Sequence, residues 1–177
     1  MHTLNILNCY LAASDEHVAE GMHWYDSARD LARSLSPDDV WRAAGVIAAF
    51  SPICPWHRTE QLAINAFATG RATGHTKQNC NNAQRIMSGE HPLEVLKGNK
   101  TRAFASAIAD PNSRIATIDR HAHDIAMGRV YSDKERKIGK AVFRTLSDAY
   151  REAADYAGIS VNAMQAITWV SWRARKQ

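Results

Sequence analysis

The segment Leu96-Lys-Gly-Asn-Lys-Thr-Arg-Ala-Phe104, followed by Ala116-Thr-Ile-Asp-Arg-His-Ala-His123, decides the fold that this sequence predicts. Gly98 marks a hairpin turn that we expect to place Lys100 at the start of a helix. Nineteen residues later, Asp119 stands where the N-cap of another helix is expected. An amine and a carboxylate at two helix starts suit attack on an electrophilic sugar carbon, and they also suit stabilisation of the cation formed as a base departs.

The hydrophobic pattern around this segment is helical almost throughout. Apolar residues recur at three- and four-residue steps, and cap and breaker residues separate the helical stretches. No strand pair, repeat or linker is visible, so we expect one compact all-α domain over residues 1–177. The predicted helices cover about 18–31, 40–50, 56–68, 77–87, 92–96 and 100–108, a helix opened by Asp119, and 133–156 and 160–173, with the C-terminal helices within 133–174 packing back on the rest.

Size and composition exclude several classes of protein. A chain of 177 residues is long enough to bury a substantial core, and no apolar run approaches the ~20 residues that span a membrane. The N-terminus lacks the pattern of a secretory signal, so we expect a cytoplasmic protein that does not bind membranes. The cysteines (Cys9, Cys54 and Cys80) are odd in number and widely spaced, which argues against a disulfide framework and a structural zinc site. We predict no metal and no cofactor.

Charge is distributed unevenly along the chain. Residues 1–50 carry three basic and seven acidic side chains, whereas residues 97–144 carry eleven basic and five acidic ones. The basic part coincides with the hairpin and with the helix that Asp119 opens. A basic face of this kind predicts salt-dependent attraction to the phosphates of double-stranded DNA.

These motifs resemble the helix-hairpin-helix Gly/Pro-Asp DNA glycosylases, the superfamily that includes endonuclease III and the 8-oxoguanine glycosylases. In those enzymes a hairpin Gly-x-Lys precedes the Asp of a Val-Asp-x-His segment by a similar interval. The resemblance extends to the helix starting near Gly74-His-Thr-Lys77 and to the stretch from Val46 to Arg58, where the family runs a buried helix into a base-probing loop. It covers roughly residues 40–130. The first hairpin glycine of the family is missing, because Glu94-Val-Leu-Lys-Gly-Asn-Lys100 stands in its place.

The resemblance implies an all-α, glycosylase-like fold and a set of site residues. Lys100 would attack the sugar C1′ and form a Schiff base, which also permits strand cleavage, and Asp119 would stabilise the sugar cation or help to deprotonate the amine. The target nucleotide must leave the stack and enter a pocket, for which we select Phe50, Trp56 and His57. The residues expected to contact DNA are Lys97, Gly98, Asn99, Thr101, Arg102, Arg120 and His121.

Simpler interpretations stay open beside this one. Lys100 also fits a phosphate contact, and Asp119 also fits a plain N-cap. Two further functions remain: an enzyme of the same fold that elaborates a modified base in phage DNA, and a non-catalytic module that binds DNA or a host protein. The Ser-Pro…Pro-Trp, Ile-Asp-Arg-His and Gln165-Ala-Ile-Thr-Trp169 segments look like small uncharacterised proteins of actinobacterial phages, which would place the protein in the host cytoplasm. We make no prediction of oligomeric state.

Overall fold

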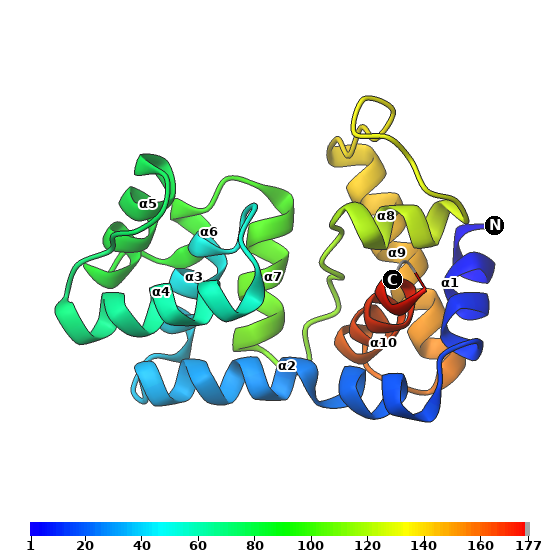
Figure 1. The fold of residues 1–177 in the computed structure, drawn as a ribbon, viewed down its shortest axis with the longest axis horizontal. Helices are drawn as coiled ribbons and strands as arrows, with labels where there is room; N and C mark the ends of the chain where they lie inside the picture. The colour runs from blue at the N-terminus through cyan, green and yellow to red at the C-terminus, as the bar shows by residue number, and fades with distance from the viewer. Residues whose placement is uncertain (176–177) are drawn as a thin grey trace. The chain divides into compact units, whose positions relative to one another are not determined.

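The structure, a computed structural model, describes residues 1–175 and is all-α over that range, as the sequence predicts. No strand occurs among these residues, and none of their helices is long and apolar enough to cross a membrane. The helices are shown in Figure 1: α1 (His2–Leu11), α2 (Asp15–Leu35), α3 (Val40–Phe50), α4 (Trp56–Thr69), α5 (Lys77–Met87), α6 (Pro92–Val95), α7 (Asn99–Ala109), α8 (Arg120–Met127), α9 (Lys140–Ala157) and α10 (Val161–Ala174).

The helices gather into two compact units. Unit 1 combines Met1–Asp26 with the chain from Pro111 onward, and unit 2 is Ser27–Asp110. The boundary falls inside α2, so the first half of this helix belongs to unit 1 and the second half to unit 2. In that second half Arg29 is buried, and it donates to the carbonyl oxygens of Ala107 and Ile108 at the end of α7. A cation at a helix C-terminus satisfies carbonyls that lack a partner within the helix.

Unit 2 is built around α3. The Asp39 side chain accepts a hydrogen bond from the Arg42 N–H at 3.0 Å and so caps the start of this helix. Every residue from Ala43 to Phe50 is buried, as the nearly unbroken apolar run predicts. The helix packs against α4, α5, α6 and α7. At Gly45 an added Cβ would lie 2.4 Å from the Pro92 ring, so only glycine permits this approach to α6.

Unit 1 packs α1 against α8, α9 and α10. The first ten residues of α10 are buried except for Trp169, and several of them are polar. The start of α2 approaches this helix closely, because an added Cβ at Gly21 would lie 2.5 Å from Ile167 Cα. Helix α9 presents a strip of buried residues from Phe143 to Ala154, as its amphipathic pattern predicts, and it ends at Gly158 in the left-handed conformation with φ of 67°.

The structure of unit 1 differs from the sequence prediction in two places. Helix α9 begins at Lys140 rather than just beyond Ser132. The intervening residues form the loop 128–139. In this loop the Glu135 carboxylate accepts from the hydroxyl and backbone N–H of Ser132, and the Ser132 hydroxyl accepts from the Glu135 N–H. The Arg136 side chain donates to Asp124 on α8. These local bonds compete with continuation of a helix. Helix α1 was not predicted, and its burial of Ile6 and Cys9 against the rest of unit 1 accounts for it.

Candidate functional site

The carboxylate of Asp119 is held in place by two donors. Asp119 is the N-cap of α8, and its Oδ1 accepts the Ala122 N–H at 2.8 Å. Its Oδ2 accepts the indole N–H of Trp169 on α10 at 3.2 Å. The side chain is half-buried. These two hydrogen bonds use about half of the acceptor positions that a carboxylate offers. The prediction that Asp119 opens a helix is confirmed, whereas nothing local in the sequence indicates its contact with Trp169.

Aromatic and cationic side chains surround the Trp169 indole. The ring of His121 meets it edge-on with 6.3 Å between centroids, and Trp24 tilts against it at the same distance. The Arg173 guanidinium lies 4.4 Å from the centre of its ring. These contacts fix the indole that orients Asp119, and they place flat, half-exposed rings next to the carboxylate.

A small buried polar network includes Thr117, two residues before Asp119. The Tyr25 hydroxyl donates to Gln165 Oε1 at 2.8 Å and lies 3.1 Å from Thr117 Oγ1, which can donate to it in turn. Burial raises the pKa of Tyr25 well above its usual value, and the negative charge of Asp119 adds to this shift. The network ties the segment before α8 to α2 and α10.

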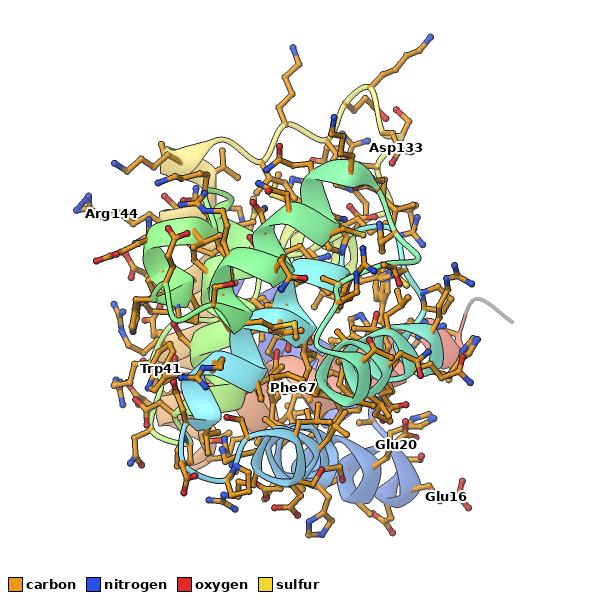
Figure 2. The ribbon with its side chains drawn as sticks, turned by 90° about the vertical axis from the view of Figure 1, so that its left-hand side faces the viewer. Glu16, Glu20, Trp41, Phe67, Asp133 and Arg144 are labelled. Atoms are coloured by element: carbon orange, nitrogen blue, oxygen red, sulfur yellow. The ribbon has the colours of Figure 1, made fainter. Side chains whose placement is uncertain are left out.

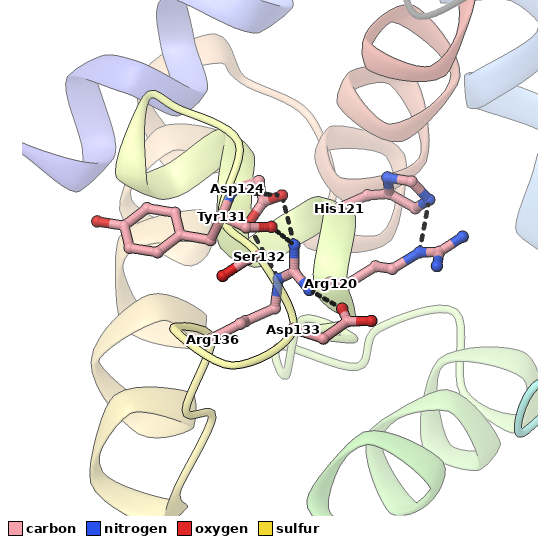
Figure 3. Close-up of a pocket in the computed structure, with 7 residues that line it drawn as sticks. All are labelled: Arg120, His121, Asp124, Tyr131, Ser132, Asp133 and Arg136. Carbon is pink, nitrogen blue, oxygen red and sulfur yellow. Dashed lines mark hydrogen bonds and ion pairs between the residues drawn. The ribbon is translucent and has the colours of Figure 1, made fainter.

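A pocket of about 380 Å³ opens beside the first turn of α8 (Figure 3). An ion pair lies within it: Arg136 Nε donates to Asp124 Oδ1 at 3.1 Å and Nη2 to Oδ2 at 2.9 Å. The Tyr131 hydroxyl points away from this pair. The lining residues are Arg120, His121, Asp124, Tyr131, Ser132, Asp133 and Arg136.

The Asp124 carboxylate is saturated by its partners. Besides Arg136, it contacts His123 Nδ1 at 3.0 Å and accepts the Tyr131 N–H at 3.3 Å, and its side chain is 1% exposed. Burial opposes its ionisation, but the hydrogen bonds from Arg136, His123 and Tyr131 outweigh burial and hold the pKa of Asp124 below its usual range. Arg136 also bonds Asp133 and the Tyr131 carbonyl. The ion pair therefore fixes the loop 128–139 to α8.

In unit 2, the predicted hairpin residues surround the start of α7. Gly98 is the N-cap, with an extended backbone, and Thr101 Oγ1 donates to its carbonyl at 3.0 Å. The Lys97 amine donates to the Glu94 carbonyl at 2.7 Å. Lys100 is half-buried in the first turn of α7. Of its predicted DNA-contacting neighbours, Asn99 and Thr101 are half-buried, and Lys97, Gly98 and Arg102 are exposed.

The residues selected for a base pocket differ in accessibility. Phe50 is fully buried and stacks against His75 with ring centroids 6.3 Å apart. Trp56 is half-buried and meets Phe104 edge-on at 6.4 Å, and His57 is exposed. Phe104 lies about one turn after Lys100, so this contact joins Trp56 to the helix that carries Lys100.

The structure also shows an unusual residue that sequence reasoning missed. Ile53 stands in the loop between α3 and α4, is 104% exposed, and has φ of 54°. This left-handed conformation is strained for a β-branched residue. His75 anchors the loop: its Nδ1 accepts the Thr76 N–H at 2.7 Å, so Nε2 carries the proton and donates to the Pro52 carbonyl at 3.1 Å. The flanking prolines signal a loop in the sequence, but they do not reveal the positive φ.

The predicted site residues are divided between the two units. Asp119, Arg120 and His121 lie together at the start of α8 in unit 1, and the hairpin residues lie together in unit 2. That Lys100 and Asp119 act at one site stays a prediction. Among residues 1–175, no three His, Cys, Asp or Glu side chains form a group able to hold a metal ion.

The fold and the site together describe an all-α protein in which the Asp119 carboxylate is oriented by two hydrogen bonds and residues 97–144 are rich in basic side chains. A family model described as "Family of unknown function (DUF7178)" matches residues 1–176, and the chain belongs to this family. Comparison with curated proteins and with solved structures finds no match.

Proposed function

We propose that this protein is a DNA glycosylase-like enzyme that flips out a damaged or modified base and excises it. The observation that carries the proposal is the Asp119 carboxylate, which is held by the Ala122 N–H and the Trp169 indole and keeps acceptor positions for a ligand. A negative charge fixed before the reaction stabilises the cationic sugar without the energetic cost of reorganising water. The basic segment around it fits a polyanionic substrate.

Lys100 supplies the nucleophile in the full form of this mechanism. Its neutral amine forms a bond to C1′ while the bond from C1′ to the base breaks. The base leaves with the bonding electrons and takes up a proton, and the amine gives one up. Opening of the sugar ring then yields a Schiff base, from which strand cleavage can follow. The position of Lys100 in the first turn of α7, directly after the predicted hairpin, supports this role.

Ile53 fits the wedge that base flipping requires. Proteins that unstack DNA insert apolar side chains between base steps. Ile53 is fully exposed at the tip of a loop whose backbone His75 fixes, and the Trp56–Phe104 contact ties the start of α4 to α7. Strain held at such a tip is typical of functional sites. The wedge and Lys100 therefore belong to the same unit.

A non-catalytic DNA-binding module is the second candidate. The observation that favours it is that both oxygens of Asp119 already accept hydrogen bonds within unit 1. In that case Asp119 serves only as a cap and as an anchor for Trp169, and Lys100 contacts a phosphate.

The two candidates are separated by assaying duplexes with varied bases for base release and strand nicking. We expect Asp119→Asn to retain DNA binding and to slow base release by about 10²-fold or more, since the amide supplies no negative charge. Lys100→Gln should abolish the covalent protein–DNA adduct trapped by borohydride. Asp148→Asn, at an exposed ion pair on α9, is the matched control and should leave base release unchanged.

Thermal unfolding of each variant has to accompany the kinetics, because Asp119 also caps α8. Base release that depends on Asp119 without a trapped adduct would make Lys100 a phosphate contact and the enzyme monofunctional. DNA binding by the wild type without base release from any duplex, and with no effect of either substitution, would support the binding module instead.

A further inference from the structure

The loop 128–139 carries a group of exposed cations that the proposed site does not use. Lys134 and Lys137 lie in this loop, and Lys140 and Arg144 follow in the first turns of α9. All four side chains are exposed, and none has an ion-pair partner within 4 Å among the residues that the structure describes. Figure 2 labels Asp133 and Arg144, which both project outward into solvent.

The acidic residues of the loop leave these cations available, because each already has a partner. Asp133 bonds the Arg136 guanidinium at 2.6 Å, and Glu135 accepts hydrogen bonds from the hydroxyl and backbone N–H of Ser132. Arg129 lies over the Tyr131 ring at 4.0 Å. The loop 128–139 carries four cations and two anions, and Lys134 and Lys137 are cations that its carboxylates do not bind.

The loop is ordered in advance by the Asp124–Arg136 ion pair. A twelve-residue connection without helix or strand is usually either mobile or functional. Here the buried carboxylate of α8 receives two bonds from Arg136 and one from the Tyr131 N–H, so the backbone is fixed at both positions. A fixed loop loses less conformational entropy when it binds a partner.

The same ion pair sets the loop beside the proposed site. Ser132, Asp133 and Arg136 line one pocket with Arg120 and His121, which directly follow Asp119 (Figure 3). We propose that Lys134, Lys137 and Lys140 form a phosphate-binding segment. This segment binds the DNA backbone next to the nucleotide that Asp119 faces. This inference rests on the proposed function for its partner, and it assigns the backbone contact to residues outside the hairpin.

The test measures the salt dependence of binding to one DNA duplex. Each phosphate contact contributes about 0.9 to the slope of log K against log salt concentration, so Lys134→Gln/Lys137→Gln should reduce the slope by about 1.8. The reduction should be similar for duplexes of different sequence, because phosphate contacts carry no base information. Both residues are exposed, so the fold and the thermal unfolding temperature should be unchanged.

Arg71→Gln/Lys77→Gln removes the same charge at exposed positions of unit 2 and should leave the slope within about 0.5 of the wild type. Equal slopes for the loop variant and the wild type would overturn the inference while leaving DNA binding, and with it the proposed function, intact. A wild-type protein that does not bind DNA would overturn both. If the protein bound phosphatidylglycerol vesicles through the loop and did not bind DNA, the partner of the loop would be a membrane surface, and the inference would be overturned.

Discussion

Units 1 and 2 are both all-α, but they are stabilised in different ways. Unit 2 is centred on α3, whose last eight residues are buried and apolar. Unit 1 buries many polar side chains: Thr117, His123, Asp124, Ser147, Asn162, Gln165, Thr168 and Ser171 among them. The hydrophobic effect has no preferred direction, whereas a buried hydrogen bond fixes the orientation of its partners. Unit 1 therefore has the means to orient a carboxylate, and unit 2 presents its candidate residues at helix ends and on a loop.

The largest loss of stability should come from a substitution in the apolar core of unit 2. Phe50→Ala removes a fully buried ring that packs at the end of α3 and stacks against His75, and we expect it to lower the free energy of unfolding by about 4 kcal/mol. Chemical denaturation measures this loss. Phe67→Ala on α4 is the control, since Phe67 is only half-buried and should cost distinctly less. Equal losses at the two positions would contradict the assignment of α3 as the core of unit 2.

In unit 1 the largest loss of stability should come from breaking an ion pair, the one between Asp124 and Arg136. Asp124→Asn leaves the Arg136 guanidinium, whose side chain is 8% exposed, without its buried counter-charge. We expect a loss of about 3 kcal/mol in the free energy of unfolding at neutral pH. Asp155→Asn breaks the exposed pair with Arg114 and should cost less than about 1 kcal/mol. A negligible loss for Asp124→Asn would show that apolar packing, not the ion pair, holds the loop 128–139.

The stability loss of Asp124→Asn should depend on pH, whereas the loss from an apolar substitution in unit 2 should not. Because the folded-state pKa of Asp124 is lowered, its ionisation stabilises the fold above the usual aspartate pKa of ~3.9. That stabilisation is lost as pH falls through the lower folded-state pKa. The difference in unfolding free energy between the wild type and Asp124→Asn should thus be constant from pH 7 to about 5 and shrink on further acidification. For Phe50→Ala the difference should not depend on pH in this range.

Local signals in the sequence were enough to predict most helices. The cap at Ser160 and the stop at Gly158 act within a few residues, so they can be recognised without tertiary contacts. The predicted start of α9 was wrong, because Arg136 forms a tertiary contact with Asp124 that the hydrophobic periodicity of the sequence does not reveal. The Trp169 contact with Asp119, which spans fifty residues, lay beyond sequence reasoning for the same reason.

The smallest loss of stability should come from the polar network of Tyr25, Thr117 and Gln165. Tyr25→Phe keeps the ring and its volume but removes the hydrogen bonds with Gln165 and Thr117, so we expect a loss of about 1 kcal/mol in unfolding free energy. Tyr156→Phe, at a position 74% exposed, should change nothing measurable. The network also supports the segment that presents Asp119. If buried hydrogen bonds orient the site, Tyr25→Phe should therefore slow base release by more than its small effect on stability explains, with DNA binding unchanged. A fully active variant with the expected small loss of stability would show that the Ala122 and Trp169 contacts alone orient the carboxylate.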